Sequence, residues 1–339
     1  MRIILFLLLA LISDLCYGQS YRLFTTDQHL SSSLINNIYE DSKGMIWIAT
    51  EDGLNRYDGS KVTIYKHDIE DKHSLVHNYV CAIFEDSHGN LYIGSYGGLQ
   101  IYNYAEDNFS PRATDKEGKP FYNNVSSIIE RKNGEIWVLG DYLSVVTIAE
   151  NKQPIIERIE ADIPIESSAY MIEDDNGDIW ASRGEGVYQI ITENGRIQSK
   201  SHKLDASICL CKDTEGNIYA GSMHKGLHIF DKKQEKFVNI PYTTGENLPV
   251  KHIFLLDSDR ILLSTDGKGA KIYNIRTKEF SNYTFESANF ESSTLKVHAV
   301  MKDRDENLWF ALYQKGVAMI PNISNSFGYI GYKSVNKNV

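Results

Sequence analysis

The chain has little that would suit a membrane, a nucleic acid or a disulfide framework. Its only long apolar run, residues 3–12 of 339, is too short for a bilayer-spanning helix of about 20 residues. Asp and Glu outnumber Lys and Arg by 45 to 35, which argues against a nucleic-acid partner. Beyond Cys16 only Cys81, Cys209 and Cys211 remain, an odd number. We therefore expect buried thiols rather than disulfides.

The first residues have the pattern of an export signal. Met1 and Arg2 give a short positive start, the apolar run follows, and small residues end at Gly18. This predicts a signal peptide over residues 1–18 and an exported mature chain. A lipid anchor on Cys16 is the weaker reading, because bulky Leu15 stands where a small residue is needed.

A phrase recurs along the chain. "IYEDSKGMIWIATEDGLNRYDG" begins at Ile38, and "IFEDSHGNLYIGSYGGLQIYN" begins at Ile83. Most copies contain a turn that starts with Asp and ends with Gly, where Asp bonds its own backbone and Gly accepts positive φ. The residues that follow the turn, aligned by repeat, are Trp47, Tyr92, Trp137, Trp180, Tyr219, Leu262 and Trp309.

Each repeat reads as four short strands, exemplified by residues 35–39, 45–50, 53–57 and 62–65. No segment shows a sustained helical period. Units of about 45 residues with four strands are typical of propeller blades. The sequence predicts an all-β fold, a seven-bladed β-propeller with four antiparallel strands per blade. The recurring aromatic residue is expected to pack against the next blade.

The ends of the chain leave one question open. Seven blades need seven outer strands, but eight segments qualify, so either residues 21–24 or residues 327–332 close the ring. We assign the propeller to residues 19–326, and residues 327–339 to a closing strand and the start of a further, truncated repeat. That repeat is indicated because "SVNKNV" at the end has the spacing of "SLINNI" at Ser33. We expect the chain to be a piece of a longer protein.

The segment "SLINNIYEDSKGMIWIATEDGLNRYDG" resembles the regulator-propeller repeat in hybrid two-component sensors of glycan-degrading gut bacteria, and the resemblance extends over residues 21–321. It implies a periplasmic propeller that detects oligosaccharides to control glycan-utilisation genes and has no catalysis of its own. The implied partners are the oligosaccharide, a second propeller and kinase modules of a longer parent protein, and a second copy in a homodimer. A membrane tether and kinase activity would belong to that parent. Two alternatives stay open: a lyase-like carbohydrate enzyme on a propeller, and a protein-docking scaffold.

Motifs for metal or cofactor chemistry are weak. Asp174, Asn176, Asp178 and Glu185 fit four positions of a calcium loop, but Ile179 stands where that loop needs Gly. His224 and His228 are four apart in a strand pattern, where that spacing does not place both on one helical face. No phosphate-binding loop or nucleophile elbow is present. We expect no metal, no cofactor and no catalytic residue, although an acidic pair that cleaves sugars stays open.

The loops between the second and third strands differ from repeat to repeat. They should share one face with the segments that lead into the innermost strands, such as Asn36–Asn37, His77–Asn78 and Asn123–Asn124. Aromatic and polar side chains there suit a carbohydrate, although wet loops are polar in any case. The candidate ligand-binding residues are Tyr96, Asp141, Tyr142, Arg183, Glu185, His224, Lys225, Tyr313 and Gln314.

Overall fold

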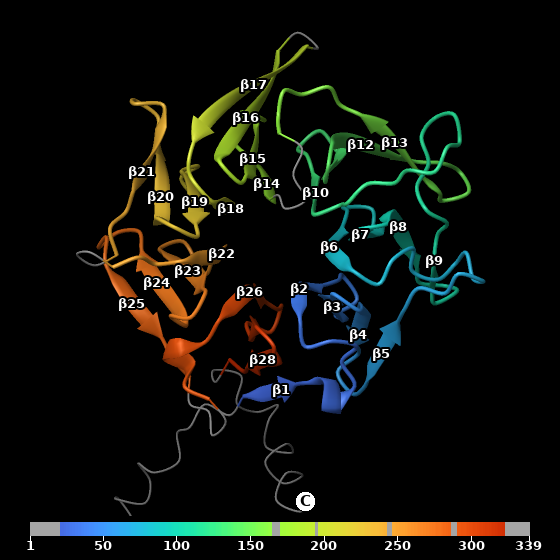
Figure 1. Ribbon diagram of the computed structural model, residues 1–339, viewed down its shortest axis with the longest axis horizontal. Coiled ribbons are helices and arrows are strands. Elements are labelled where there is room, and N and C mark those ends of the chain that lie inside the picture. The colour runs from blue at the N-terminus through green and yellow to red at the C-terminus, as the bar shows by residue number, and fades with distance from the viewer. Residues whose placement is uncertain (1–20, 165–169, 194–195, 243–245, 286–289, 323–339) are drawn as a thin grey trace, which may run out of the picture.

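The computed structural model describes residues 21–164, 170–193, 196–242, 246–285 and 290–322. These residues form seven four-stranded antiparallel sheets arranged radially around a central channel (Figure 1). The prediction of a seven-bladed propeller is confirmed. The predicted signal peptide, residues 1–18, and the predicted closing segment, residues 327–339, lie outside the described residues.

Each blade runs outward from an innermost strand beside the channel. Blade 1 contains β2 (Ile35–Glu40), β3 (Ile46–Thr50), β4 (Gly53–Tyr57) and β5 (Val62–Tyr65). Blade 2 contains β6 (Val80–Glu85), β7 (Leu91–Ser95), β8 (Gly98–Asn103) and β9 (Asn108–Phe109). Blade 3 contains β10 (Ser127–Glu130), β11 (Ile136–Leu139), β12 (Leu143–Ile148) and β13 (Pro154–Arg158).

The second half of the ring repeats this order. Blade 4 contains β14 (Tyr170–Glu173), β15 (Ile179–Arg183), β16 (Gly186–Glu193) and β17 (Arg196–Lys203). Blade 5 contains β18 (Ser207–Lys212), β19 (Ile218–Ser222), β20 (Gly226–Asp231) and β21 (Lys236–Asn239). Blade 6 contains β22 (Val250–Leu255), β23 (Arg260–Thr265), β24 (Ala270–Asn274) and β25 (Phe280–Tyr283). Blade 7 contains β26 (Val297–Lys302), β27 (Leu308–Leu312), β28 (Gly316–Ile320) and, as its outer strand, β1 (Arg22–Phe24). Two 3₁₀ turns, η1 (Thr26–Gln28) and η2 (Ser292–Thr294), lie in connections.

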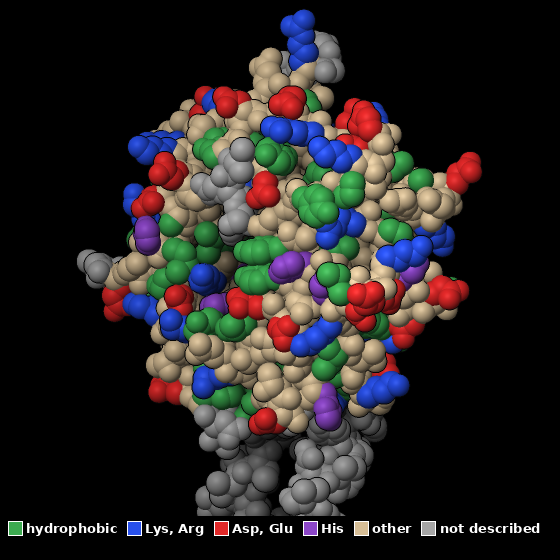
Figure 2. Space-filling view, turned by 45° about the vertical axis from the view of Figure 1, so that its right-hand side comes forward, with side chains coloured by type: hydrophobic (Ala, Val, Ile, Leu, Met, Phe, Trp, Pro, Cys, Tyr) green, Lys and Arg blue, Asp and Glu red, His purple; other side chains and the backbone are tan. Residues whose placement is uncertain are grey.

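Pairing of the two ends of the described chain closes the ring. β1 is antiparallel to β28, with Arg22 opposite Met319 and Phe24 opposite Val317. Of the two candidates, the N-terminal strand therefore completes blade 7. Both ends of the described chain lie at this blade in Figure 1. Acidic and basic side chains are mixed over the visible face in Figure 2.

The recurring turn is tied to the aromatic residue that follows it. In blade 1, one oxygen of Asp41 accepts hydrogen bonds from the backbone N–H groups of Lys43 and Met45, at 2.9 Å each. The other oxygen accepts from the indole Nε1 of Trp47 at 2.8 Å. Gly44 closes the turn with φ +81°. The same Asp-to-aromatic bond is present in the pairs Asp86–Tyr92, Asp174–Trp180, Asp213–Tyr219 and Asp303–Trp309. One carboxylate therefore fixes both the turn and the ring that enters the core.

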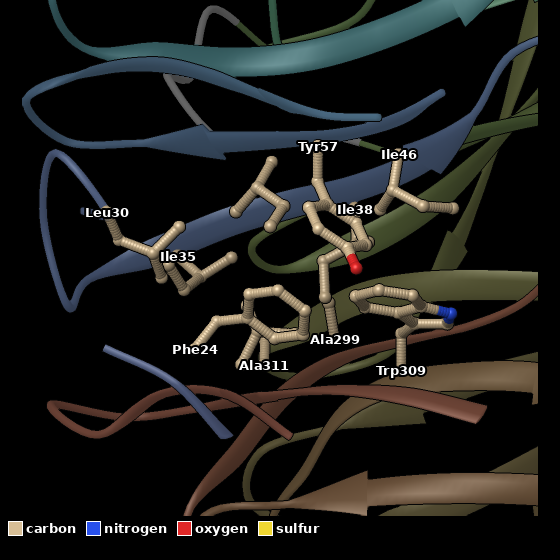
Figure 3. Packing of buried hydrophobic residues seen from close by; sticks show 11 residues of the cluster. Phe24, Leu30, Ile35, Ile38, Ile46, Tyr57, Ala299, Trp309 and Ala311 are labelled. Atoms are coloured by element: carbon tan, nitrogen blue, oxygen red, sulfur yellow. The ribbon is translucent and has the colours of Figure 1, made fainter. Parts of the chain in front are cut away.

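Each aromatic ring fills the space between two blades. Trp47 is fully buried against Val80 and Leu91 of blade 2, and its ring centroid lies 4.7 Å from that of Tyr102. Figure 3 shows the equivalent contact between blades 7 and 1, where Trp309 packs beside Ile38 and Tyr57. The six aromatic residues predicted at this position are at most 3% exposed. The predicted packing between blades is confirmed.

Candidate functional site

The loops between the second and third strands share one face with the connections between blades. Tyr96 N–H donates to the carbonyl of Tyr79 at 3.1 Å, and Gly53 N–H donates to that of Asn78 at 2.7 Å. The first bond joins a loop of blade 2 to the segment that leads into the innermost strand of the same blade, and the second joins a loop of blade 1 to the connection between blades 1 and 2. We call this side the loop face.

The innermost strands are irregular where they reach the loop face. In the described pairing, β2, β6, β18, β22 and β26 each contain a register shift after their first residue. Such a bulge breaks the alternation of side chains and re-aims the residues around it. The extra residues are Asn36, Cys81, Ile208, Lys251 and His298. All five line the central channel together with the residue that follows each of them.

The channel forms a cavity of about 560 Å³ lined by residues of all seven innermost strands. Lys251, His252 and His298 are its ionisable basic residues, and no Asp or Glu is among its described lining residues. The thiols of Cys81 and Cys209 also line it, and burial raises the pKa of each to about 12. Although the whole chain has a formal charge of −10, the lining therefore contains a cation and no carboxylate.

The two histidines of the channel are held neutral. Burial lowers the pKa of His252 to about 4. Its Nδ1 atom is buried, with no hydrogen-bond partner in the described structure. Burial, and then the nearby Lys251 ammonium, lower the pKa of His298 to about 4 as well. At pH 7 each imidazole offers one N–H donor and one nitrogen acceptor.

Aromatic rings stand at the mouth of the channel on two sides. On blade 2, Tyr96 stacks on Tyr79 with ring centroids 4.1 Å apart, and His77 lies 6.2 Å from Tyr96. On blade 7, Tyr313 packs on His298 with centroids 4.8 Å apart. Tyr79, Tyr96 and His298 also line the cavity. Figure 2 shows hydrophobic side chains, the class that includes Tyr, and histidines around a hollow near the middle of the visible face. We call the region around Tyr79, Tyr96, His298 and Tyr313 the channel mouth.

Two of the predicted ligand-binding residues lie at the channel mouth. Tyr96 is 45% exposed and Tyr313 is 37% exposed, each with one ring face covered by a neighbouring ring. Gln314 is exposed beside Tyr313, with its amide nitrogen 3.5 Å from the phenol oxygen.

The remaining six predicted residues belong to blades 3, 4 and 5 and do not line the cavity: Asp141, Tyr142, Arg183, Glu185, His224 and Lys225. Tyr142 is covered by the guanidinium of Arg158, 3.9 Å from the ring centroid, while Asp141 is held by Asn123 and Asn124. Glu185 and Lys225 are exposed, and exposed His224 pairs with Asp205 at 3.0 Å.

Arg183 differs from the expectation of an open loop side chain. It is the last residue of β15 and is fully buried, and its guanidinium donates to the carbonyl of Gly140 in blade 3 at 2.5 Å. Blades 1 and 2 have Thr50 and Ser95 at the equivalent strand end. A side chain at this position points between blades, so a long one reaches the neighbouring sheet instead of the solvent.

Four residues at the cavity were not among the predicted ligand-binding residues: Tyr79, Lys251, His252 and His298. Lys251, His252 and His298 are each the second or third residue of an innermost strand. The residue type at these positions differs between repeats, and this variation could have indicated a binding site. Another aromatic residue, Tyr122, is 72% exposed, has Arg112 at 4.1 Å from its ring centroid and does not line the cavity.

Asp174, the first residue of the calcium-loop pattern, stabilises the turn between β14 and β15. Its carboxylate accepts from the backbone N–H groups of Asn176 and Asp178 and from the Trp180 indole. Within the described part of the chain, no group of three or more His, Cys, Asp or Glu residues could hold a metal. No helix in that part has the length and hydropathy needed to span a bilayer.

Comparison with known proteins finds relatives from two-component systems. Residues 29–52 and 74–97 match the model of the family described as two component regulator propeller. A histidine kinase of Formosa agariphila is 38% identical over 55 residues, which are 16% of this chain and 4% of that protein. The extracellular domain of a hybrid two component system from B. thetaiotaomicron has a TM-score of 0.73 at 22% identity, over 88% of this chain and 41% of that one.

A propeller of another kind also superposes. Virginiamycin B lyase from Staphylococcus aureus has a TM-score of 0.65 at 14% identity, over 90% of this chain and all of that one. At these identities the structural matches show the fold alone. The family match and the two-component relatives confirm the resemblance that the repeats indicate. The chain spans less than half the length of both two-component relatives.

Proposed function

We propose that this chain is the N-terminal propeller of a periplasmic sensor region and detects oligosaccharides to control glycan-utilisation genes. The observation that carries the proposal is the channel mouth. Two aromatic pairs, the stacked pair Tyr79–Tyr96 and the tilted pair His298–Tyr313, stand at the rim of a cavity whose largely apolar lining includes a few polar side chains. Apolar ring faces with a few convergent polar groups are what a sugar needs, since its C–H face stacks and its hydroxyls bond.

We base the proposed role of this chain within a larger sensor on the greater length of its relatives. It covers 41% of the extracellular domain from B. thetaiotaomicron, which contains further structure. A closed ring of seven braced blades has little that can rearrange, whereas signalling needs two states with different ligand affinity. We therefore propose that a second propeller, kinase modules of a longer parent and a homodimer partner supply the rearrangement. The chain alone should bind sugar weakly and drive no response.

The test is calorimetric titration of oligosaccharide pools into the purified chain. Tyr96→Ala and Tyr313→Ala should each weaken binding several-fold, because each removes one stacking face of the channel mouth. Tyr122→Ala is the matched control, because this exposed tyrosine does not line the cavity. Saturable binding that is unchanged in the Tyr96→Ala/Tyr313→Ala double variant would refute the channel mouth as the sugar site.

The same titration separates the alternatives. Turnover of an oligosaccharide by the purified chain would favour a carbohydrate-active enzyme, and the fold shared with virginiamycin B lyase shows that a propeller of this size can belong to a lyase. A protein partner that binds in the absence of any sugar affinity would favour a docking scaffold.

A further inference from the structure

The charge inside the channel is opposite in sign to that of the chain. Lys251 lines the cavity, and the described lining residues include no Asp or Glu that could pair with its ammonium. By contrast, Lys268 and Lys296, on loops of the same face, pair with Glu246 at 2.9 Å and Asp266 at 3.1 Å. A partly buried ammonium in a cavity without carboxylates has lost part of its hydration and gained no counter-charge. An anion that enters the cavity would supply that charge.

The groups beside Lys251 suit an oxyanion as well. His252, the next residue along β22, also lines the cavity and has a buried Nδ1 without a hydrogen-bond partner. His298, on the neighbouring β26, lines the cavity as well. Neutral imidazoles can each donate one hydrogen bond, and Lys251 can donate three. Charge-assisted donors of this kind bind carboxylate and sulfate oxygens strongly.

The aromatic rings and the cation belong to blades on opposite sides of the channel. Tyr79 and Tyr96 belong to blade 2 and Lys251 belongs to blade 6, and β6 and β22 lie on opposite sides of the channel in Figure 1. A sugar ring stacked on the blade 2 side of the mouth would therefore have Lys251 on the opposite side of the channel. Two carboxylates close enough to act on cavity residues have partners, because Glu51 accepts from Tyr79 and Asp266 pairs with Lys296.

We propose that the channel mouth recognises acidic sugars, with Lys251 as the counter-charge for a carboxylate or a sulfate ester and His252 as a further donor. This inference rests on the proposed function and specifies the class of ligand. The aromatic rings hold the sugar ring, and Lys251 selects the charged substituent. Neutral oligosaccharides bind more weakly because they leave the ammonium without a counter-charge.

The experiment uses two pairs of probes that differ only in charge. Oligogalacturonides are compared with the same oligosaccharides after carboxyl reduction, and sulfated chondroitin oligosaccharides with their desulfated forms. Each probe is titrated calorimetrically into the wild-type chain, Lys251→Met and Lys72→Met. Lys72 is the matched control, an exposed lysine in the connection between blades 1 and 2 that does not line the cavity. Circular dichroism confirms that each variant is folded, and Lys251→Gln is a second variant that removes the charge.

The wild type should bind at least one acidic probe about tenfold or more tightly than its neutral partner, with affinity that falls as salt rises. Lys251→Met should abolish this preference, and Lys72→Met should keep it. A response to only one of the two acidic groups identifies the group and supports the inference. Equal affinity for charged and neutral probes, or a preference that survives Lys251→Met, would overturn the inference and leave sugar sensing intact. Binding of no probe by the wild type would overturn both.

Discussion

Replacing Asp174 by Asn tests whether one carboxylate holds both the turn and the core of a blade. In the folded chain one oxygen of Asp174 accepts two backbone N–H groups, and the other accepts the Trp180 indole at 2.9 Å. Trp180 is 2% exposed, so its N–H has no access to water. An Asn side chain must turn its NH₂ group toward one of these donor sets. One set of donors therefore loses its acceptor.

The expected cost comes from two effects on one bond. A hydrogen bond to a charged group contributes about 1.5–3 kcal/mol, and a buried donor without a partner costs about 1–3 kcal/mol. Because both estimates describe overlapping losses, we expect Asp174→Asn to lower the free energy of unfolding by about 2–4 kcal/mol. In a Trp180→Phe background the indole N–H is gone, so the same substitution should cost at least about 1.5 kcal/mol less.

The chain contains its own control in blade 6. There Leu262, which has no polar atom, stands at the aromatic position, and Asp257 pairs with Arg260 at the surface at 2.5 Å. Exposed pairs of this kind contribute about 0–1 kcal/mol, so Asp257→Asn should cost about 1 kcal/mol or less. Guanidinium unfolding followed by far-ultraviolet circular dichroism measures all four variants: Asp174→Asn, Trp180→Phe, the double variant and Asp257→Asn. Equal costs at Asp174 and Asp257, or additive effects of Asp174→Asn and Trp180→Phe, would refute the reasoning.

Three further outcomes are expected. Trp180→Ala should cost about 3–5 kcal/mol by emptying an aromatic core site between blades, and a near-neutral denaturant midpoint would contradict that role. Gly316→Ala should be strongly destabilising, because the residue has φ +88° and an added Cβ would lie 2.0 Å from the Phe24 carbonyl oxygen. Gly59→Ala has φ +93° but open space around the added Cβ, so it should cost only about 1 kcal/mol; thermal unfolding of both variants measures the difference. Burial lowers the pKa of His252 and His298 from 6.5 to about 4. Since the unfolded chain binds these protons first, stability should be full above pH 6.5 and fall toward pH 4, by up to about 3 kcal/mol through His252 and by less through the more exposed His298. His252→Phe should flatten that slope in unfolding curves measured between pH 7.5 and 4.5.

The fold could be predicted because the residues that specify each blade lie close together in the sequence and recur in every repeat. Each copy of the phrase contains a turn, two strands and one core aromatic, and a unit that cannot bury its apolar face alone needs neighbours. Trp47 and Trp309 were placed correctly from that pattern. The partner of β1 could not be chosen in this way, because residues 21–24 and 327–332 have the same strand pattern and only long-range pairing separates them.

The candidate site was predictable only where its residues stand on loops. Tyr96 and Tyr313 were placed on the exposed loop face because loops between strands reach the solvent, and their role in binding stays a prediction. Arg183 was predicted to lie on an exposed loop. It is instead the last residue of β15, where the side chain points into the protein. Lys251 and His298 were missed because a bulge interrupts the period of two, and a strand read by strict alternation assigns such residues to the wrong face.

The pairing of β1 with β28 sets the order of events in folding. Arg22 and Met319 are roughly 300 residues apart in the sequence, so bringing them together costs about 5 kcal/mol of chain entropy beyond a constant. Six blades can assemble from neighbouring segments as the chain is synthesised. β1 has no partner until the last blade is complete, so its apolar side chain Phe24 stays without its final packing until then. Contacts between distant segments slow folding, and we expect this last step to limit its rate. During that interval blade 7 has an unpaired edge, which makes it the part of the nascent ring most exposed to aggregation.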